Sequence, residues 1–238
     1  MSSQPDQAPV DTAREKRLNR WQRPLVTWWD RVAAWTNSLL VDHAFIRAVY
    51  LNRHKISSRA WRSAQPLPHQ LRDFARQGVK TVVSLRGGQT FGSLPLEKEA
   101  CEQNGLTFIN FVMRSRSIPS AEDIHAADRL FREIDYPVLF HCKSGADRAG
   151  FMAVLFLVLA EGRSVAEARR QLSLKYGHIK EGKTGVLDAF WDAYERDTGG
   201  KTPLLDWVDT RYDRDAVQAG FEPTGWGSLI ADRLLRRE

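Results

Sequence analysis

The sequence predicts an α/β domain with a largely parallel central sheet and helices on both faces. Between residues 60 and 160, short apolar segments of strand length alternate with amphipathic segments of helix length. Such alternation is typical of parallel sheets, and Gly or Pro separates many of the segments. An apolar share of 42% over 238 residues is enough for a buried core, which excludes a wholly disordered chain.

Each predicted element has a periodicity or a boundary signal of its own. The predicted strands are short, mainly apolar runs at 60–63, 81–85, 107–112 and 138–141. The predicted amphipathic helices lie at 69–77, 96–104, 120–135, 164–176 and 184–195. Residues 150–160 are apolar on every side, which predicts a buried helix. Ser120 with Asp123, and Ser164 with Glu167, have the spacing of N-terminal capping boxes.

Four regions are predicted along the chain. Residues 1–20 are polar and of mixed charge, which is typical of a disordered tail. An amphipathic Trp-rich segment follows at 21–58, then the main domain at 59–200, then an irregular extension at 201–238 with a short helix near 228–236. The chain has no apolar run of spanning length, and its first residues lack the apolar core of a signal peptide. We therefore expect a cytoplasmic protein.

The basic excess of the chain lies in its first quarter. Lys and Arg outnumber Asp and Glu by 35 to 29 overall, but by 10 to 5 within residues 1–60. Four tryptophans fall within residues 21–35, where the apolar spacing predicts a helix that starts after Pro24. No nucleic-acid motif is present and the cations are not densely clustered, so no nucleic-acid partner is expected.

Two alternatives stay open for residues 21–55. The first is packing of the helix on the main domain. The second is an interfacial helix on the anionic inner face of the membrane, with tryptophans at headgroup level and Arg20, Arg23 and Arg31 toward the lipid. The second alternative would make the protein a peripheral membrane protein.

A segment between a buried strand and a buried helix points to chemistry: His141-Cys142-Lys143-Ser144-Gly145-Ala146-Asp147-Arg148. We call residues 143–148 the anion loop. Its small residues allow successive backbone N–H groups to point inward, and the positive end of the following helix faces the same place. Arg148 offers a planar fork for two phosphate oxygens. Cys142 lies at the mouth of the loop, where these features favour a nucleophilic thiolate. The combination indicates covalent phosphoryl transfer.

The cysteine count excludes other kinds of site. Two cysteines cannot build a disulfide scaffold, and six scattered histidines add no zinc-ligand spacing, so neither a metal nor a cofactor is expected. Cys101 is expected in the core. Two other cysteine-loop enzymes fit the sequence less well than a phosphatase. A sulfur transferase would have a shorter cysteine loop, and an arsenate reductase would need resolving cysteines nearby.

Cys142-x5-Arg148, preceded by His141, resembles the phosphate loop of the cysteine-dependent protein tyrosine phosphatase superfamily. The short domain resembles the bacterial dual-specificity branch, whose first two strands are similar to residues 61–66 (WRSAQP) and 82–86 (VVSLR). The resemblance covers about residues 59–195 and implies a phosphate monoester hydrolase that forms a cysteinyl-phosphate.

The resemblance also implies roles for individual residues. Cys142 would be the nucleophile and Arg148 the phosphate clamp, while His141 would support the loop and favour the thiolate. The phosphoryl oxygens would be bound by the anion loop, which consists of Lys143, Ser144, Gly145, Ala146, Asp147 and Arg148.

Two positions depart from the family pattern. The family carries a general-acid aspartate on a loop that corresponds to residues 113–119, which hold no carboxylate here. Asp147, beside Arg148, is the alternative proton donor, unless it only braces Arg148 or a neighbouring loop. Ala149 stands where many relatives have Ser or Thr, whose hydroxyl bonds the leaving thiolate. This substitution predicts slow hydrolysis of the phosphoenzyme.

Three alternatives remain for the substrate and function. A phosphotyrosine protein is the easiest substrate, because an aryl leaving group needs little proton donation. A membrane-lipid or inositol phosphate needs a proton donor, and the cations Lys143, Arg114 and Arg116 would suit a substrate with several anionic groups. The third alternative is a non-catalytic phosphate-binding module, because the usual acid and hydroxyl are absent.

Overall fold

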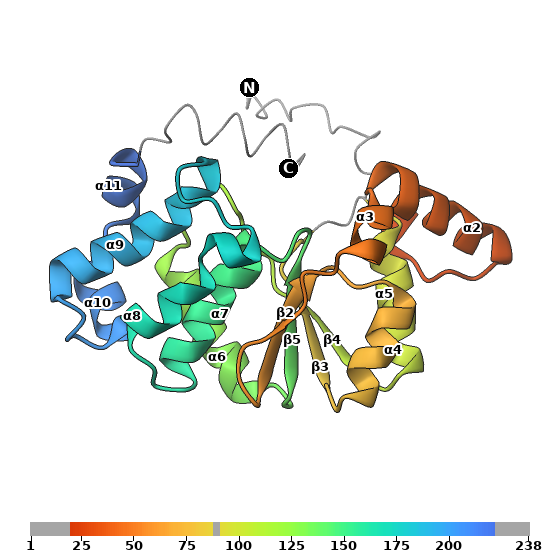
Figure 1. Ribbon diagram of the computed structural model, residues 1–238, viewed down its shortest axis with the longest axis horizontal. Helices are drawn as coiled ribbons and strands as arrows, with labels where there is room; N and C mark the ends of the chain where they lie inside the picture. The colour runs from red at the N-terminus through yellow and green to blue at the C-terminus, as the bar shows by residue number, and fades with distance from the viewer. Residues whose placement is uncertain (1–19, 88–90, 222–238) are drawn as a thin grey trace, which may run out of the picture.

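A central sheet with helices on both sides forms the middle of the molecule (Figure 1). The computed structural model describes residues 20–87 and 91–221. Within these residues the sheet has five strands in the order β1 (His54–Lys55), β2 (Ala60–Ala64), β5 (Val138–Cys142), β3 (Thr81–Ser84) and β4 (Thr107–Asn110). β1 runs antiparallel to β2, and the other neighbouring strands are parallel. The predicted α/β class with a largely parallel sheet is confirmed.

The helices divide between the two faces of the sheet (Figure 1). One face is covered by α4 (Pro68–Arg76) and α5 (Ser93–Gln103), and the other by α6 (Ala121–Glu133), α7 (Asp147–Leu159) and α9 (Val186–Thr198). α7 and α9 are joined through short helical turns, α8 (Val165–Ala168), η2 (Arg169–Gln171), η3 (Leu174–Tyr176) and η4 (Lys183–Gly185). The chain continues into α10 (Leu204–Thr210) and α11 (Arg214–Ala219).

The central strands are buried on both sides because their side chains alternate between two cores. Val83 of β3 and Phe140 of β5 belong to the core under α6, α7 and α9. Their neighbours Val82 and Leu139 belong to the core under α4 and α5. This two-sided burial explains why the strands are nearly continuous apolar runs rather than alternating ones.

The N-terminal segment packs on the main domain through one of its sides. It consists of α2 (Trp28–Thr36), the π-helical η1 (Asn37–Val41) and α3 (Ala44–Val49). Ala34 packs with Trp21 and with Leu96 of α5, and a Cβ at Gly92 would clash with the backbone of Ala34. The first alternative for this segment therefore occurs in the structure, while its opposite side is exposed.

The helix predicted to start after Pro24 is present as α2, which begins at Trp28 because Thr27 and Asp30 form the capping box. Two other local predictions are wrong. The helix predicted at 164–176 ends at Ala168 and continues only as the 3₁₀ turns η2 and η3. The Gln171 carbonyl between these turns accepts a hydrogen bond from the Arg62 side chain rather than from a helical N–H.

The second error concerns the chain after Lys201, which is helical rather than irregular. α10 and α11 form there, and Trp207 of α10 is fully buried in the core. Apart from Arg20, the predicted tail lies outside the described residues, as does the helix predicted near 228–236. The predicted region boundaries at 20, 58 and 200 stay predictions.

Candidate active site

Cys142 is the last residue of the central strand, and the anion loop joins it to the N-terminus of α7. β2 and β3 flank β5 in parallel, so that Ala64 is paired with Cys142 and Ser84 with His141. α7 spans 13 residues and starts at Asp147, which directs the positive end of its dipole toward the loop. Arg148 lies in the first turn of this helix. The topology therefore brings Cys142, the loop and Arg148 together at the carboxyl edge of the sheet.

Side chains from outside the anion loop hold its carbonyl groups. Nη2 of Arg62 on β2 donates to the carbonyl oxygens of Gly145 (2.7 Å) and Ala146 (2.8 Å). Nδ2 of Asn52 donates to the carbonyl oxygen of Ser144 (3.0 Å) and to that of Tyr176 (2.9 Å). The carbonyl groups of Ser144, Gly145 and Ala146 thus point outward, toward Asn52 and Arg62. Because the C=O and N–H of a peptide unit point in opposite directions, the N–H groups of the loop point inward. That is the arrangement of a backbone nest for an anion.

Gly145 is required by both conformation and space. Its φ of 73° lies in the left-handed region, which favours glycine. A Cβ at this position would lie 2.5 Å from the backbone nitrogen of Ala64 and 2.5 Å from the carbonyl carbon of Ser63. The loop therefore passes directly over the end of β2, and a larger residue would push it away.

His141 points to the opposite side of β5 from Cys142. It is fully buried, and its Nε2 lies 2.6 Å from Oε1 of Glu97 on α5. Glu97 Oε2 accepts a second contact, a hydrogen bond from Nε2 of Gln65 (2.7 Å). The residue before Cys142 is thus tied to α5 and to the segment that follows β2.

A buried carboxylate of the N-terminal segment lies beside the anion loop. Asp42 accepts hydrogen bonds from Arg86 (2.7 and 2.8 Å), Arg47 (2.8 Å) and Ser93 (2.9 Å). Its Oδ1 also lies 3.8 Å from Nζ of Lys143 in the loop. Burial by itself raises the pKa of Asp42, but the hydrogen bonds and charges of Arg86 and Arg47 prevail and lower it to about 2. The ionised carboxylate therefore fixes Arg86 and faces Lys143.

Asp147 contacts a histidine that the sequence analysis did not single out. Nδ1 of the buried His178 lies 2.8 Å from Oδ1 of Asp147, and its Nε2 lies 2.6 Å from Oδ2 of Asp188 on α9. Burial lowers the pKa of His178, but the hydrogen bonds and charges of both carboxylates outweigh burial and raise it from 6.5 to about 9. At neutral pH both ring nitrogens donate, and Asp147 is an acceptor. The contact ties the anion loop to α9.

A family model matches this arrangement of strand, loop and helix. Residues 29–185 match the model described as "DSP-PTPase phosphatase fused to NAD+ Kinase". The chain belongs to this phosphatase family. The match covers more than half of the chain, from α2 to η4, and includes all of the anion loop. The resemblance to dual-specificity phosphatases, predicted from the cysteine loop, is confirmed.

Solved phosphatase structures are similar to this DSP-PTPase family member over much of its length. Tk-PTP in its active form is 24% identical over 57% of this chain and 92% of its own, with a TM-score of 0.48. TpbA of P. aeruginosa is 21% identical over 71% and 89%, with a TM-score of 0.48. PTPMT1 is 16% identical over 62% and 98%, with a TM-score of 0.46. No curated protein sequence matches the chain.

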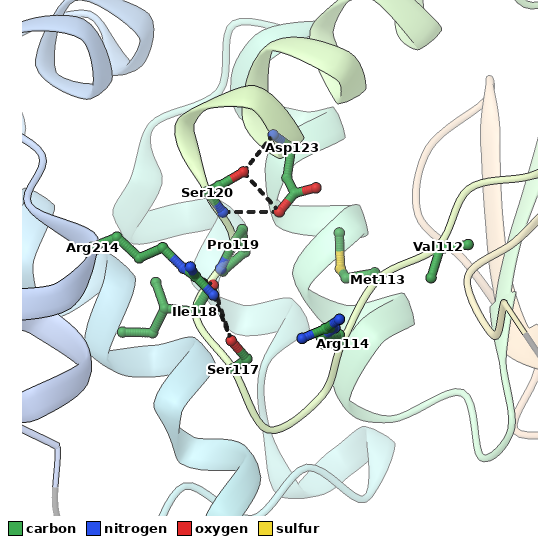
Figure 2. Close-up of a pocket in the computed structure, with 9 residues that line it drawn as sticks. All are labelled: Val112, Met113, Arg114, Ser117, Ile118, Pro119, Ser120, Asp123 and Arg214. Carbon is green, nitrogen blue, oxygen red and sulfur yellow. Dashed lines mark hydrogen bonds between the residues drawn. The ribbon is translucent and has the colours of Figure 1, made fainter. Parts of the chain in front are cut away.

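In this DSP-PTPase family member, five of residues 113–119 line a cavity of about 390 Å³ (Figure 2). Arg114 is one of the five, and Asp123 of α6 lines the same cavity. Asp123 Oδ2 accepts hydrogen bonds from the N–H (2.9 Å) and the hydroxyl (3.1 Å) of Ser120, as the predicted capping box requires. The Asp123 carboxylate therefore has a structural partner at the start of α6.

The C-terminal extension holds residues 113–119 in place. Arg214 of α11 donates to the carbonyl oxygen of Ile118 (3.0 Å) and to the hydroxyl of Ser117 (2.9 Å) (Figure 2). Leu85 lies between this loop and the end of β5: its N–H donates to the carbonyl oxygen of His141, and its carbonyl oxygen accepts from the N–H of Met113. Contact of Arg114 or Arg116 with a substrate stays a prediction.

The second cysteine has a different environment. Cys101 is buried in the core between α5 and the sheet, where burial raises the pKa of its thiol. In the described part of the chain, no group of three or more His, Cys, Asp or Glu residues is arranged to hold a metal ion. In the same part, no helix is both long and apolar enough to cross a membrane.

Sequence reasoning missed four residues that support the anion loop: Asp42, Asn52, Arg62 and His178. A signal existed for Arg62, because a cation in the middle of a short strand needs a buried partner. The other three lie in connecting segments, where a polar residue is ordinary and carries no local signal.

Proposed function

We propose that this protein hydrolyses phosphate monoesters through a cysteinyl-phosphate intermediate. The observation that carries the proposal is the arrangement at the end of β5, where Cys142 adjoins a loop with outward carbonyls and Arg148 lies in the first turn of the next helix. Membership in a phosphatase family supports the same chemistry.

The proposed reaction has two steps. The sulfur of Cys142 attacks phosphorus, the phosphorus–oxygen bond to the alcohol breaks, and the phosphoryl group passes to sulfur. The loop N–H groups and the guanidinium of Arg148 stabilise its oxygens. Water then attacks phosphorus and loses a proton to the solvent, the sulfur–phosphorus bond breaks, and inorganic phosphate and the thiolate are released. In this scheme His141, held by Glu97, supports the loop.

We further propose that aryl phosphates such as phosphotyrosine are better substrates than alkyl phosphates. Asp147 accepts an N–H from His178, which carries a proton at neutral pH, so this carboxylate is poorly suited to donate a proton. An aryl oxide leaves without a proton, whereas an alkoxide does not. This favours a phosphotyrosine protein over a lipid or inositol phosphate at this site.

A substrate panel tests the proposal. Wild type, Cys142→Ser and Asp147→Asn are compared on p-nitrophenyl phosphate, a phosphotyrosine peptide and a phosphoserine peptide. We expect an aryl preference of at least about 100-fold, and complete loss of activity in Cys142→Ser. Turnover of phosphoserine that Asp147→Asn removes, with aryl turnover retained, would assign the proton donor to Asp147. Absence of aryl turnover in wild type would leave a phosphate-binding module.

Ala149 makes the second step the slow one in this scheme, because its methyl group cannot donate to the leaving thiolate. Rapid mixing of wild type with p-nitrophenyl phosphate should therefore show a stoichiometric burst of nitrophenol before a slower steady phase. Ala149→Ser should raise the steady rate by up to about tenfold. A linear progress curve, with no phosphoenzyme trapped, would contradict slow dephosphorylation.

A further inference from the structure

The exposed large apolar side chains of the protein gather in its N-terminal segment. Within the described residues, ten of the twelve such side chains lie between Val26 and Tyr50. Scattered exposed apolar residues are normal, but a concentration of this kind marks an interaction site. We use the name exposed apolar surface for its six members on the two helices: Trp28, Trp29 and Val32 of α2, and Phe45, Ile46 and Val49 of α3.

Each of the two helices has an exposed apolar side and a buried side, and the exposed residues have the same spacing on both. On α2 the exposed positions are i, i+1 and i+4 from Trp28, and on α3 they are i, i+1 and i+4 from Phe45. This spacing places them along one side of each helix. The other sides are anchored, because Ala34 and Ala44 are fully buried. The apolar side chains are therefore presented by a folded, docked segment.

The segment that carries this surface has an excess of positive charge. Residues 20–55 contain six Lys or Arg residues and two Asp residues. Asp42 is buried among its cationic partners, and Asp30 caps α2 and pairs with Arg23 (3.1 Å). Asp42 also binds Arg86 from outside the segment, and Arg31 pairs with Glu99 of α5 (2.5 Å). Six cations against two acids still leave the segment with an excess of positive charge.

The segment also adjoins the anion loop. The hydroxyl of Tyr50, the residue after α3, donates to Oδ1 of Asn52 (3.3 Å), and Asn52 donates to the carbonyl of Ser144 (3.0 Å). In Figure 1, α3 lies near the end of the sheet where β5 runs into α7. A flat partner that covered α3 would therefore lie beside the entrance to the loop.

We infer that the exposed apolar surface docks this protein on an anionic lipid bilayer. Tryptophan side chains are suited to the headgroup level, apolar side chains such as Ile46 and Val49 to the acyl boundary, and the surrounding cations to anionic lipids. A second copy of the chain is a poorer occupant, because the two surfaces would bring like charges together. The inference does not depend on the proposed function, since lipid binding needs no catalysis.

Vesicle co-sedimentation of the full chain tests the inference. The probes are phosphatidylcholine vesicles with and without about 30% phosphatidylglycerol, at low and high salt. Wild type should bind the anionic vesicles and bind them less at high salt. The double variant Ile46→Glu/Val49→Glu should weaken binding at least about tenfold. Leu174→Glu is the matched control, because Leu174 is 76% exposed but lies outside the surface, and should bind as wild type does.

Several results would overturn the inference. Wild type that stays in the supernatant with anionic vesicles would do so, as would equal losses in the double variant and in Leu174→Glu. If wild type is a dimer in lipid-free solution and does not bind vesicles, while the double variant is a monomer, the surface would be assigned to contact with a second copy of the chain. Turnover of p-nitrophenyl phosphate should be unchanged in the double variant, which separates failure of docking from failure of the proposed function.

Discussion

His178 should make the stability of this protein fall as the pH rises above neutrality. In the folded chain its imidazole lies between Asp147 and Asp188, and its pKa is about 9, whereas the unfolded value is 6.5. A group whose pKa is raised by folding stabilises the fold below the unfolded value, and this stability is lost as the pH rises through the folded value. The full contribution is therefore present below pH 6.5 and disappears by about pH 9.

The size of the effect follows from the shift. Each pKa unit corresponds to about 1.4 kcal/mol, so the raised pKa corresponds to about 3 kcal/mol of unfolding free energy. Between pH 6.5 and 9 the unfolding free energy should fall by about 1.4 kcal/mol per pH unit. The burial of His178, which is 2% exposed, means that solvent screens this contribution little.

The assay is urea unfolding across this pH range. The unfolding free energy of the variant is subtracted from that of wild type at each pH, which cancels the contributions of other titrating groups. His178→Gln should abolish the slope. Asp188→Asn removes one of the two carboxylates that raise the pKa of His178 and keeps Asp147. The pH range over which stability falls should therefore become narrower. If His178→Gln does not fold, Asp188→Asn still tests the reasoning. A slope identical in wild type and in Asp188→Asn, or stability that increases from pH 6.5 to 9, would refute the assigned role of His178.

Two further predictions concern the surroundings of the anion loop. Asp42→Asn leaves Arg86 and Arg47 buried without their carboxylate, so urea unfolding should show an unfolding free energy that is lower by about 3–5 kcal/mol. A decrease of less than about 1 kcal/mol would contradict the stabilising role of this network. In wild type the same carboxylate should contribute about 2 kcal/mol that disappears only as the pH falls from 3.8 through 2. Gly145→Ala should lower both stability, by about 1–3 kcal/mol, and phosphatase activity, because the added Cβ meets β2. Its matched control is Gly78→Ala, where φ is 85° but no atom lies within 4 Å; equal losses of stability in the two variants would show that contact with β2 is unimportant.

Much of the fold could be predicted because its signals are local. Runs of strand length, the glycines that end helices and the Ser120 capping box each depend on neighbouring residues, and β2, β3, β5, α4 and α6 occur close to their predicted places. Prediction failed where a distant group competes with the local pattern. Residues 164–176 have a helical pattern, but the side chain of Arg62 on β2 donates a hydrogen bond to the Gln171 carbonyl. α10 was missed because its seven residues are too few to show a clear helical period, and Trp207 is stabilised by the aromatic cluster that it joins.

The proposed chemistry of the loop could be inferred from the sequence alone, because its parts are consecutive. A strand, a cysteine, a turn of small residues and an arginine at a helix start form one continuous segment, so their proximity follows from chain connectivity. The supports of that segment were decided by tertiary structure. Asn52 and Arg62 contact loop carbonyls from 92 and 83 residues away, and His178 contacts Asp147 from 31 residues away.

The sequence also left two alternatives for the Trp-rich segment, because an amphipathic pattern shows that one side of a helix is apolar without showing what covers it. The tertiary structure assigns one side of that segment to α5 and to the Asp42 network. The other side is left exposed, because a helix has residues on every side and the main domain covers one of them.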